Sequence, residues 1–469
     1  MIAGERPGPT ATARLLAHYD QPGPRYTSYP TAVEFHAGFG EREYRERLAA
    51  ADAHTDEPLS LYAHLPFCEA RCLYCGCNIV VTKHRGVASS YLENLLLELD
   101  LLARALPHRR TLSQMHWGGG TPTYYPAADL ERLFQAIAEH FRWTPDAEIG
   151  IEVDPRVTSP EQIRVLRRLG FNRLSMGVQD FDPRVQEAVH RVQSFELTAE
   201  LIHVARAEGF RSVNVDLIYG LPWQALEGFQ RTLDQVVTLR PERVAVYSFA
   251  FVPWIKPHMN HIPADALPAP ELKLALLARA IDAFTRAGYR TIGMDHFALP
   301  DDDLARAMDT GALHRNFMGY TVQSAPDMVA LGISGIGDVQ GAFAQNTKKL
   351  PEYAAQIAAG RFPIERGYAL DADDLVRRHV ITRLMCDSRL DVRDVERRFG
   401  IPFAATFATE LDELAGRGPW RTDGLLEITP DAIELTDLGR TFVRNVCMVF
   451  DRHLRRQAAQ ARPVFSRTV

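Results

Sequence analysis

The chain has 469 residues, 46% hydrophobic and 24% charged, so it is long enough to bury a large core and to form two or three domains. Its formal net charge of -6 argues against a protein that binds nucleic acid through its overall field. We expect neither a membrane span, which needs roughly 18 consecutive apolar residues, nor a secretory signal, because residues 1–13 lack an apolar core.

Residues 1–55 are rich in proline, glycine and tyrosine and end in a short polar helix expected near 42–50. The prolines of PGPRYTSYP at 22–30 force extended or turn backbone, which predicts an arm laid across another domain. We expect Arg25, Tyr26 and Tyr29 to be its contact groups, although plain packing would explain such an arm equally well.

Strands and helices alternate from about residue 57 to residue 365. Ser90 and Glu93 form a predicted capping box that opens a helix, and a helix opened by Ser159 is expected to stop at Gly170. Six or seven such repeats predict an α/β fold with a parallel sheet, curled into a full or partial barrel over residues 56–365. The strands are expected at 60–65, 115–117, 148–153, 173–179, 212–218, 243–249 and 290–294.

The pattern changes after this region, and residues 366–469 predict a small, mostly helical domain with winged-helix features. Winged helices often bind DNA, but no basic recognition helix is visible, so we prefer a lid on the barrel. Basic residues gather near the C-terminus, and they predict either a solvated face or a patch that attracts a polyanionic substrate. They are Arg452, His453, Arg455, Arg456, Arg462 and Arg467.

Four of the six cysteines lie in one short stretch, in which Cys68, Cys72 and Cys75 have the spacing C-x3-C-x2-C just after a predicted buried strand. Three thiolates on one loop can ligate three irons of a [4Fe–4S] cluster and leave the fourth iron open to a small molecule. A zinc site is the weaker alternative, because zinc motifs usually bring two separated C-x2-C pairs. Cys77 is interpreted as a neighbour and not a ligand. Thiolates imply a reducing compartment, so we expect the cytoplasm.

Polar and small residues follow the predicted strands at their carboxyl ends, where the chemistry of such barrels sits. The positions are the cysteine loop, the glycines at 118–120, Glu152, Gln179, Asp216 and Ala250. A purely structural set of such residues would not be expected to collect on one rim.

The cysteine spacing, with Tyr74 just before the last cysteine, resembles the signature loop of the radical S-adenosylmethionine (SAM) superfamily. Five further stretches resemble the oxygen-independent coproporphyrinogen III oxidase family within it, and the likeness runs from about residue 15 to the C-terminus. They are PGPRYTSYP at 22–30, HWGGGTPT at 116–123, DLIYGLP at 216–222, IGMDHF at 292–297 and RNVCM at 444–448. The resemblance implies a radical SAM partial or near-complete (β/α) barrel with an N-terminal arm and a helical C-terminal domain.

The resemblance also assigns site residues. Cys68, Cys72 and Cys75 match the cluster ligands and, with Tyr62, the catalytic positions. Contacts to a SAM molecule on the open iron are implied for Tyr62, Gly119, Glu152 and Ile336. Contacts to a second SAM are implied for Tyr74, Gly120, Thr121, Gln179, Arg191, Asp216 and Ala250. Taken alone, each charged residue is also explained by an ordinary salt bridge.

By the same resemblance, SAM is cleaved at the cluster to a 5′-deoxyadenosyl radical, which removes hydrogen from a propionate of coproporphyrinogen III. Loss of CO2 and one further electron leaves a vinyl group, and two propionates react in turn to give protoporphyrinogen IX. The implied partners are the tetrapyrrole substrate and a low-potential, flavodoxin- or ferredoxin-like electron donor, with the chain as a monomer. Arg25, Tyr26, Arg315 and the basic C-terminal residues are candidates for contact with the substrate.

The sequence departs from the family pattern at Phe251, Met318 and Val322, where hydrogen-bonding side chains are replaced by poorer or apolar ones. These changes put the second SAM site or the substrate in doubt. Two alternatives therefore stay open: a diverged radical SAM enzyme acting on another tetrapyrrole or as a methyltransferase, and a heme-binding carrier on the same fold.

Overall fold

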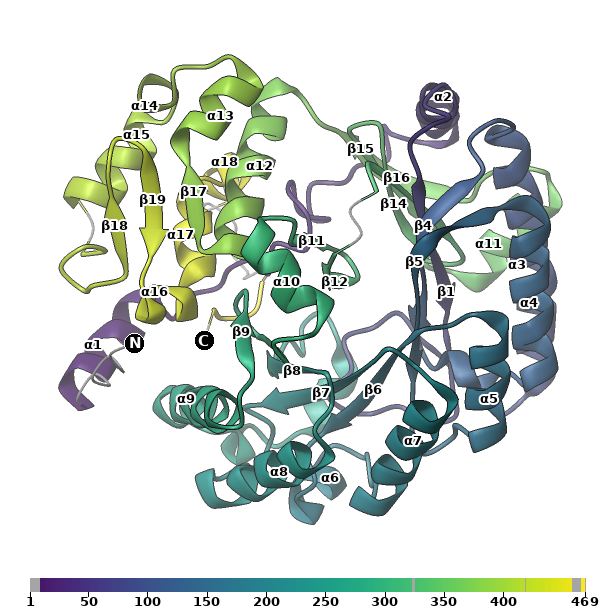
Figure 1. The fold of residues 1–469 in the computed structure, drawn as a ribbon, viewed down its shortest axis with the longest axis horizontal. Helices are drawn as coiled ribbons and strands as arrows, with labels where there is room; N and C mark the ends of the chain where they lie inside the picture. The colour runs from purple at the N-terminus through teal and green to yellow at the C-terminus, as the bar shows by residue number, and fades with distance from the viewer. Residues whose placement is uncertain (1–8, 323–324, 418, 458–464, 469) are drawn as a thin grey trace.

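Six parallel strands, most of them followed by a helix, form the curved central sheet of the computed structural model, which describes residues 9–322, 325–417, 419–457 and 465–468 (Figure 1). Their order across the sheet follows their order in the chain, so each strand pairs with the next. This confirms the predicted α/β fold with a parallel sheet. The strands are β1 (Leu59–Leu65), β4 (Thr111–Gly119), β5 (Arg142–Val153), β6 (Arg173–Gln179), β7 (Ser212–Tyr219) and β8 (Arg243–Ser248).

The sheet continues on both sides of this parallel unit, to twelve strands within the described residues. Beyond β1 come β13 (Asp327–Leu331), parallel to β1, and the antiparallel strands β14 (Ile336–Val339), β15 (Ala342–Asn346) and β16 (Ile364–Ala369). Beyond β8 come β10 (His296–Ala298) and β9 (Arg290–Ile292), both antiparallel. The expected strand at 290–294 is therefore an edge of a hairpin and not another parallel repeat. The sheet also runs past the expected domain boundary at residue 365, to Ala369.

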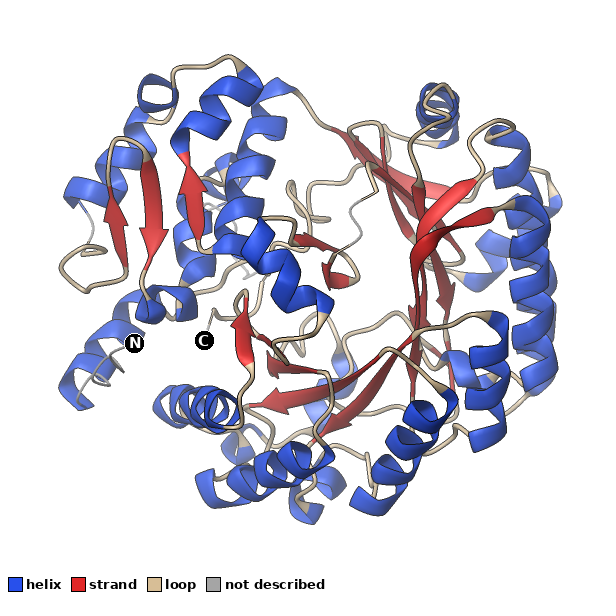
Figure 2. Cartoon of the chain, viewed as in Figure 1, coloured by secondary structure: helices blue, strands red, loops and turns tan. Residues whose placement is uncertain are grey.

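Helices cover the convex face of the sheet, and the concave face opens toward the C-terminal domain (Figure 2). The helix opened by Ser159 and ended at Gly170 is confirmed as α5, and the structure shows that Ser159 forms a capping box and that Gly170 is left-handed. The capping box at Ser90 is wrong: α3 begins at Arg85, and the Ser90 hydroxyl donates to the carbonyl of Gly86 inside the helix. The main outer helices are α3 (Arg85–Ala105), α4 (Ala127–His140), α5 (Pro160–Leu169), α7 (Phe195–Glu208), α8 (Leu226–Leu239), α9 (Pro270–Arg286) and α11 (Leu350–Ala358).

Shorter elements line the rim of the sheet and its open side. They are β2 (Phe67–Cys68), β3 (Val80–Val81), η1 (Pro122–Tyr124), α6 (Pro183–Ala188), η2 (Pro257–His261), η3 (Ala264–Ala266), α10 (Asp303–Thr310), β11 (His314–Asn316) and β12 (Gly319–Thr321).

The N-terminal segment connects the two halves of the molecule. Helix α1 (Pro9–Tyr19), which was not predicted, packs with Tyr26 and Tyr29 into the apolar core of the C-terminal domain. Helix α2 (Glu41–Asp52) packs instead into the core of the barrel. The Tyr26 hydroxyl donates to Asp451, and the Arg25 guanidinium donates to the carbonyl of Ser248 at the end of β8. The expected arm is therefore present, and all three expected contact groups take part in it.

The C-terminal domain is mostly helical, as predicted, and it also carries a three-stranded sheet. Its helices are α12 (Ala372–Asp387), α13 (Val392–Phe399), α14 (Phe403–Thr406), α15 (Ala408–Asp412), the π-helical turn η4 (Glu413–Arg417), α16 (Asp437–Thr441), α17 (Val443–Val449) and α18 (Arg452–Gln457). Its strands are β17 (Arg389–Asp391), β18 (Leu426–Ile428) and β19 (Ala432–Leu435).

The basic residues near the C-terminus are engaged within the protein. Arg452 pairs with Asp371, Asp373 and Asp374, and the buried His453 also contacts Asp374. Arg455 pairs with Glu413, and Arg467 pairs with Asp20. These pairs attach α18 and the C-terminal residues to the domain. The side chain of Arg456, and Arg462, lie outside the described residues.

Glu98, on α3, joins three elements on the antiparallel side of the sheet. Its carboxylate accepts hydrogen bonds from the Gly332 amide (2.6 Å), the Tyr353 hydroxyl (2.6 Å) and the Asn346 side chain (2.7 Å). Burial raises the pKa of Glu98 to about 7, and the three hydrogen bonds act in the opposite direction. The folded protein therefore holds this proton at a pH at which the unfolded chain has already released it.

We predict that Glu98→Gln removes a pH dependence of stability. Between the unfolded pKa near 4.5 and the folded pKa near 7, ionisation of Glu98 lowers the free energy of unfolding as the pH rises, by about 3 kcal/mol in total. Urea unfolding of the wild type and the variant at pH 5 and pH 8 measures this. Between pH 5 and pH 8 the unfolding free energy of the variant relative to the wild type should rise by about 2.5 kcal/mol, since a small part of the effect is already present at pH 5. Glu93→Gln, on the exposed face of the same helix, is the control, and an equal shift there would contradict the assignment.

Candidate active site

The cysteine loop leaves the carboxyl end of β1 and is held against the loop that follows β4. The Gly120 amide donates to the Leu65 carbonyl (2.9 Å), and the Thr121 amide donates to the Phe67 carbonyl (2.9 Å). Phe67 itself is fully buried. The position of the first cysteine is therefore fixed by the backbone of the two adjacent strands.

The three cysteines of the motif turn toward one region at the end of the loop. Cys72 is buried, and Cys68 and Cys75 are partly exposed. Burial raises the pKa of Cys68 to about 11, and the nearby charges of Cys75 and Cys72 add to this shift. Among the described side chains, no three His, Cys, Asp or Glu residues are arranged to hold a single metal ion. Three thiols near one another on one loop suit a cluster, in which each sulfur binds a different iron.

Cys77 lies beside the motif and contacts Cys75. A hydrogen bond from the Cys77 thiol is the largest of the effects that lower the pKa of Cys75 to about 6. Cys77 also lines the cavity next to the loop. Its interpretation as a neighbour of the cluster stays a prediction.

A cavity of about 440 Å³ opens beside the cysteine loop. It is lined by all four residues that were predicted to contact the first SAM, namely Tyr62, Gly119, Glu152 and Ile336. These residues come from four different strands, β1, β4, β5 and β14, so only the folded sheet brings them together. A cavity of this size beside the cysteine loop suits a small-molecule ligand.

Two histidines that the sequence analysis missed support this cavity. His64 Nδ1 lies 3.0 Å from the Tyr62 hydroxyl, and His64 Nε2 lies 2.9 Å from the Asn78 carbonyl oxygen. His116 lies 3.4 Å from Glu152, which also accepts from the Gly119 amide at 3.1 Å. Burial opposes ionisation of Glu152, but the hydrogen bond from His116 and its charge lower its pKa. The alternation of side chains along a strand could have identified them, because residues two positions apart lie on the same face.

The three glycines after β4 make room for the protein's own groups. A Cβ atom on Gly118 would lie 2.8 Å from the Glu152 carboxylate, and one on Gly120 would lie 2.5 Å from the Pro66 backbone. Gly119 has a φ of +117°, and its Cβ would meet His64 at 2.6 Å. Side chains here would displace the cysteine loop and both cavity residues.

Five of the seven residues predicted for a second SAM fall into two sets. Gly120 and Thr121 hold the cysteine loop, and the Thr121 hydroxyl also lies 3.5 Å from Cys68 Sγ. Gln179 and Arg191 meet around Gly177, whose added Cβ would touch both side chains. Tyr74 adjoins Arg191, since the two interact electrostatically. Ala250 follows β8 and is half-buried.

Two buried polar atoms in this second set lack a hydrogen-bond partner among the described residues: Gln179 Oε1, an acceptor, and Arg191 Nε, a donor. The other Arg191 nitrogens donate to Asp154 (2.9 Å) and to the Gly177 carbonyl (2.7 Å). An ammonium and a carboxylate would satisfy this acceptor and this donor. The amino-acid part of SAM carries both groups, so these residues fit it.

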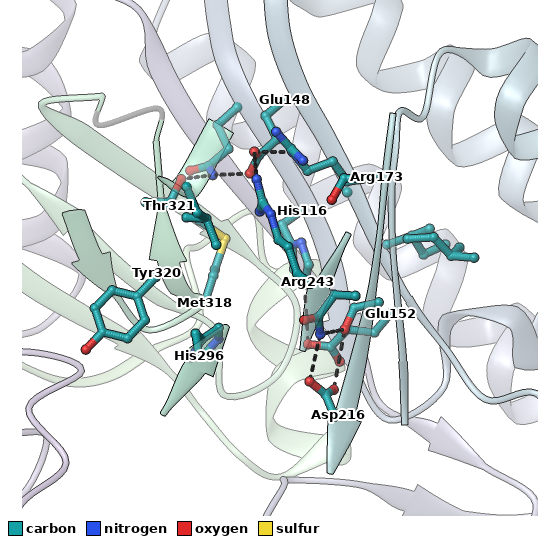
Figure 3. A pocket seen from close by; sticks show the side chains of 18 of the residues that line it. His116, Glu148, Glu152, Arg173, Asp216, Arg243, His296, Met318, Tyr320 and Thr321 are labelled. Carbon is teal, nitrogen blue, oxygen red and sulfur yellow. Dashed lines mark hydrogen bonds and ion pairs between the residues drawn. The ribbon is translucent and has the colours of Figure 1, made fainter. Parts of the chain in front are cut away.

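Asp216 lies deeper, in a polar chamber of about 120 Å³ inside the sheet, which also holds Glu152 (Figure 3). Burial raises the pKa of Asp216 to about 6, although a hydrogen bond from Asn214 at 2.8 Å favours its ionised form. Asp216 on β7 is paired in register with Gly177 on the adjacent strand β6, so it lies next to the second set. The chamber therefore holds one residue predicted for each SAM, Glu152 for the first and Asp216 for the second.

The three departures from the family pattern have different surroundings. Met318 lines both the cavity beside the cysteine loop, called the SAM cavity below, and the polar chamber. Phe251 packs on Phe249, with ring centroids 6.1 Å apart, and Val322 packs against a separate apolar cluster. Met318 is therefore the departure that faces the site directly.

No helix in the described part of the chain is long and apolar enough to cross a membrane.

The chain matches the Radical SAM superfamily over residues 62–236 and the HemN C-terminal domain over residues 370–442.

Its relatives include proteins named oxygen-independent coproporphyrinogen III oxidase. The protein from Escherichia coli is 45% identical, with 97% of this chain and 98% of the relative covered. The protein from Pseudomonas aeruginosa is 43% identical, with 94% of this chain and 96% of the relative covered. The solved structure described as "Coproporphyrinogen III oxidase (HemN) from Escherichia coli is a Radical SAM enzyme" superposes with a TM-score of 0.87. It is 45% identical, and 92% of this chain and 97% of that chain are covered.

The family implies a [4Fe–4S] cluster and SAM, and the three cysteines and the adjoining cavity fit both groups. From the motif, the cavity and these relatives together, we conclude that the chain belongs to the oxygen-independent coproporphyrinogen III oxidase family of the radical SAM superfamily.

Proposed function

We propose that the chain catalyses the oxygen-independent oxidative decarboxylation of two propionates of coproporphyrinogen III to vinyl groups, giving protoporphyrinogen IX. The observation that carries the proposal is the cavity in which Tyr62, Gly119, Glu152 and Ile336 meet beside the cysteine motif. Relatives that carry this activity in their name match nearly the full length of the chain at 41–45% identity.

Within the site, Cys68, Cys72 and Cys75 would hold the cluster, with Tyr62 as the catalytic tyrosine. When bound, the cluster and SAM supply the one-electron chemistry that removes hydrogen from the propionate. Glu152, kept ionised by His116, is placed to accept hydrogen bonds from an ammonium or from ribose hydroxyls. The glycines at 118–120 let the cysteine loop, Glu152 and His64 approach the backbone closely.

Anaerobic reconstitution followed by product analysis tests the function. Protoporphyrinogen IX, CO2 and 5′-deoxyadenosine are expected from coproporphyrinogen III. A different product with 5′-deoxyadenosine would point to a diverged enzyme, and heme binding without SAM turnover would point to a carrier. Full-length similarity to the named oxidases favours neither alternative.

A second SAM, held by Tyr74, Gln179, Arg191, Asp216 and Ala250, is part of the proposal, with Gly120 and Thr121 at its edge. Its support is the unpartnered pair of Gln179 Oε1 and Arg191 Nε. We also propose a low-potential donor of the flavodoxin or ferredoxin type and a cytoplasmic location, supported by the thiols that must stay reduced. We also propose that the chain is a monomer.

A cavity of about 400 Å³ between the N-terminal arm and the β11–β12 turn suits the tetrapyrrole. Arg25 and Arg366 can pair with carboxylates there, and Tyr26, Phe317 and Phe465 offer aromatic surface. Phe317 also lines the SAM cavity, so the two cavities share a wall. A macrocycle in the arm cavity would therefore have a propionate near the bound SAM.

We predict that Cys72→Ala prevents assembly of the cluster, because one of three iron ligands is lost. Iron and sulfide content after reconstitution, and 5′-deoxyadenosine formed with dithionite, should both fall to background. Cys77→Ala is the matched control and should retain its iron. Loss of iron in both variants would contradict the interpretation of Cys77.

Gln179→Met should lower the number of bound SAM molecules from two to one. The change keeps the length of the side chain but removes the acceptor for an ammonium. Equilibrium dialysis with radiolabelled SAM on the cluster-loaded protein gives the stoichiometry. A wild type that binds one SAM, or a variant that still binds two, would count against the second site.

Arg366→Met should weaken binding of coproporphyrin III, a fluorescent oxidised form of the substrate, about tenfold or more. A hydrogen bond to a charged group contributes about 1.5–3 kcal/mol, which corresponds to this factor. Fluorescence titration needs neither turnover nor SAM. Arg361→Met changes an exposed arginine nearby as a control, and equal affinities in the two variants would rule out Arg366 as a carboxylate partner.

A further inference from the structure

Two guanidinium groups face the sulfur of Cys72. Arg156 Nη2 donates to Cys72 Sγ at 3.5 Å, and Arg191 Nη1 does so at 3.8 Å. Among the three cysteines of the motif, Cys72 is the buried one, so these contacts are little screened by solvent. Arg156 was not singled out by the sequence, and none of the roles described above uses it.

Asp154 holds the two arginines in place. Its carboxylate accepts from Arg156 Nη2 at 2.7 Å and from Arg191 Nη1 at 2.9 Å. The Arg156 backbone amide also donates to Asp154 Oδ1 at 3.0 Å, which fixes the turn after β5. Arg191 follows α6 on the next part of the rim. The arrangement places two positive charges and one negative charge against a single ligand sulfur.

We propose that Arg156 is a positioning residue that raises the reduction potential of the cluster through Cys72, and that Asp154 limits this effect. The inference rests on the proposed function, in which Cys72 binds one iron. Reduction adds one electron from an external low-potential donor, and the added charge spreads onto the ligand sulfurs. An N–H donor and a positive charge at the sulfur stabilise the reduced form more than the oxidised one.

The role is assigned to Arg156 and not to Arg191 because their surroundings differ. Arg191 also donates to the Gly177 carbonyl and retains an unpartnered Nε, which suits it to the second SAM. The guanidinium of Arg156 contacts only Asp154 and Cys72 among the hydrogen bonds of the described residues. Its place in the structure is therefore defined by the sulfur and by the carboxylate that orients it.

The test is a redox titration, followed by electron paramagnetic resonance, of the anaerobically reconstituted protein without SAM or substrate. Arg156→Met should make reduction at least threefold less favourable at a fixed potential, which is a shift of about 30 mV downward for a one-electron couple. Asp154→Asn should shift the midpoint upward, because it removes the opposing charge. Arg156→Lys keeps the positive charge, so a smaller downward shift is expected. If Arg156→Met assembles no cluster, Arg156→Lys is titrated in its place.

The matched control is Arg377→Met. Arg377 is also a largely buried arginine between two carboxylates, Asp373 and Glu410, but it lies in the C-terminal domain. The midpoint reduction potential of the cluster in this variant should equal that of the wild type. A purely structural role of Arg156 would change cluster content or thermal stability and leave the midpoint unchanged, and that result would overturn the inference.

The titration separates this inference from the proposed function. A shifted midpoint together with a wrong product would overturn the function and leave the role of Arg156 intact. An unshifted midpoint with normal turnover would overturn the role of Arg156 alone. A wild type that assembles no [4Fe–4S] cluster would overturn both.

Discussion

The site depends on the position of β1 within the sheet. This strand is paired in parallel with β13 on one side and β4 on the other, and nearly all of its residues are buried. Because parallel strands end at the same edge, the chain that leaves β1 must pass beside the loop that leaves β4. The hydrogen bonds from Gly120 and Thr121 use this neighbourhood to hold the cysteine loop. A metal-binding loop of this kind needs such a rigid base, since its ligands alone do not fix its orientation.

The sequence was sufficient where a signal is local and repeats. The strand at Arg173–Gln179 and the helix from Ser159 to Gly170 were predicted at their observed ends, because alternation of apolar residues and paired caps are read from nearby residues. The cysteine motif could be found for the same reason. In contrast, α3 has no side-chain cap at its true start, so a serine inside the helix was mistaken for one.

The features that the sequence did not reveal depend on pairing between distant segments. Strands β14 to β16 are short and antiparallel, and nothing in their own residues states that they extend the sheet beyond β13. Similarly, the contacts between Arg156, Asp154 and Cys72 join two separate loops at the same rim of the sheet, and no spacing along the chain predicts them. The four residues that line the SAM cavity were placed by resemblance to a family, and the fold supplies the physical reason why they meet.

The N-terminal arm contacts both halves of the molecule. It packs by Tyr26 and Tyr29 into the core of the C-terminal domain, while Arg25 reaches the end of β8 on the barrel. The arm cavity is lined mainly by the arm, with Phe317 and Arg366 from the barrel side and Phe465 from near the C-terminus. A substrate with four carboxylates and an apolar ring needs arginines and aromatic rings around a space too wide for one element to supply. Arg25, Arg366 and Phe317 come from the arm, β16 and the β11–β12 turn, and they meet where Phe317 borders the SAM cavity. The C-terminal domain contributes Phe465 to this cavity and, by packing around Tyr26 and Tyr29, fixes the arm that forms most of its lining.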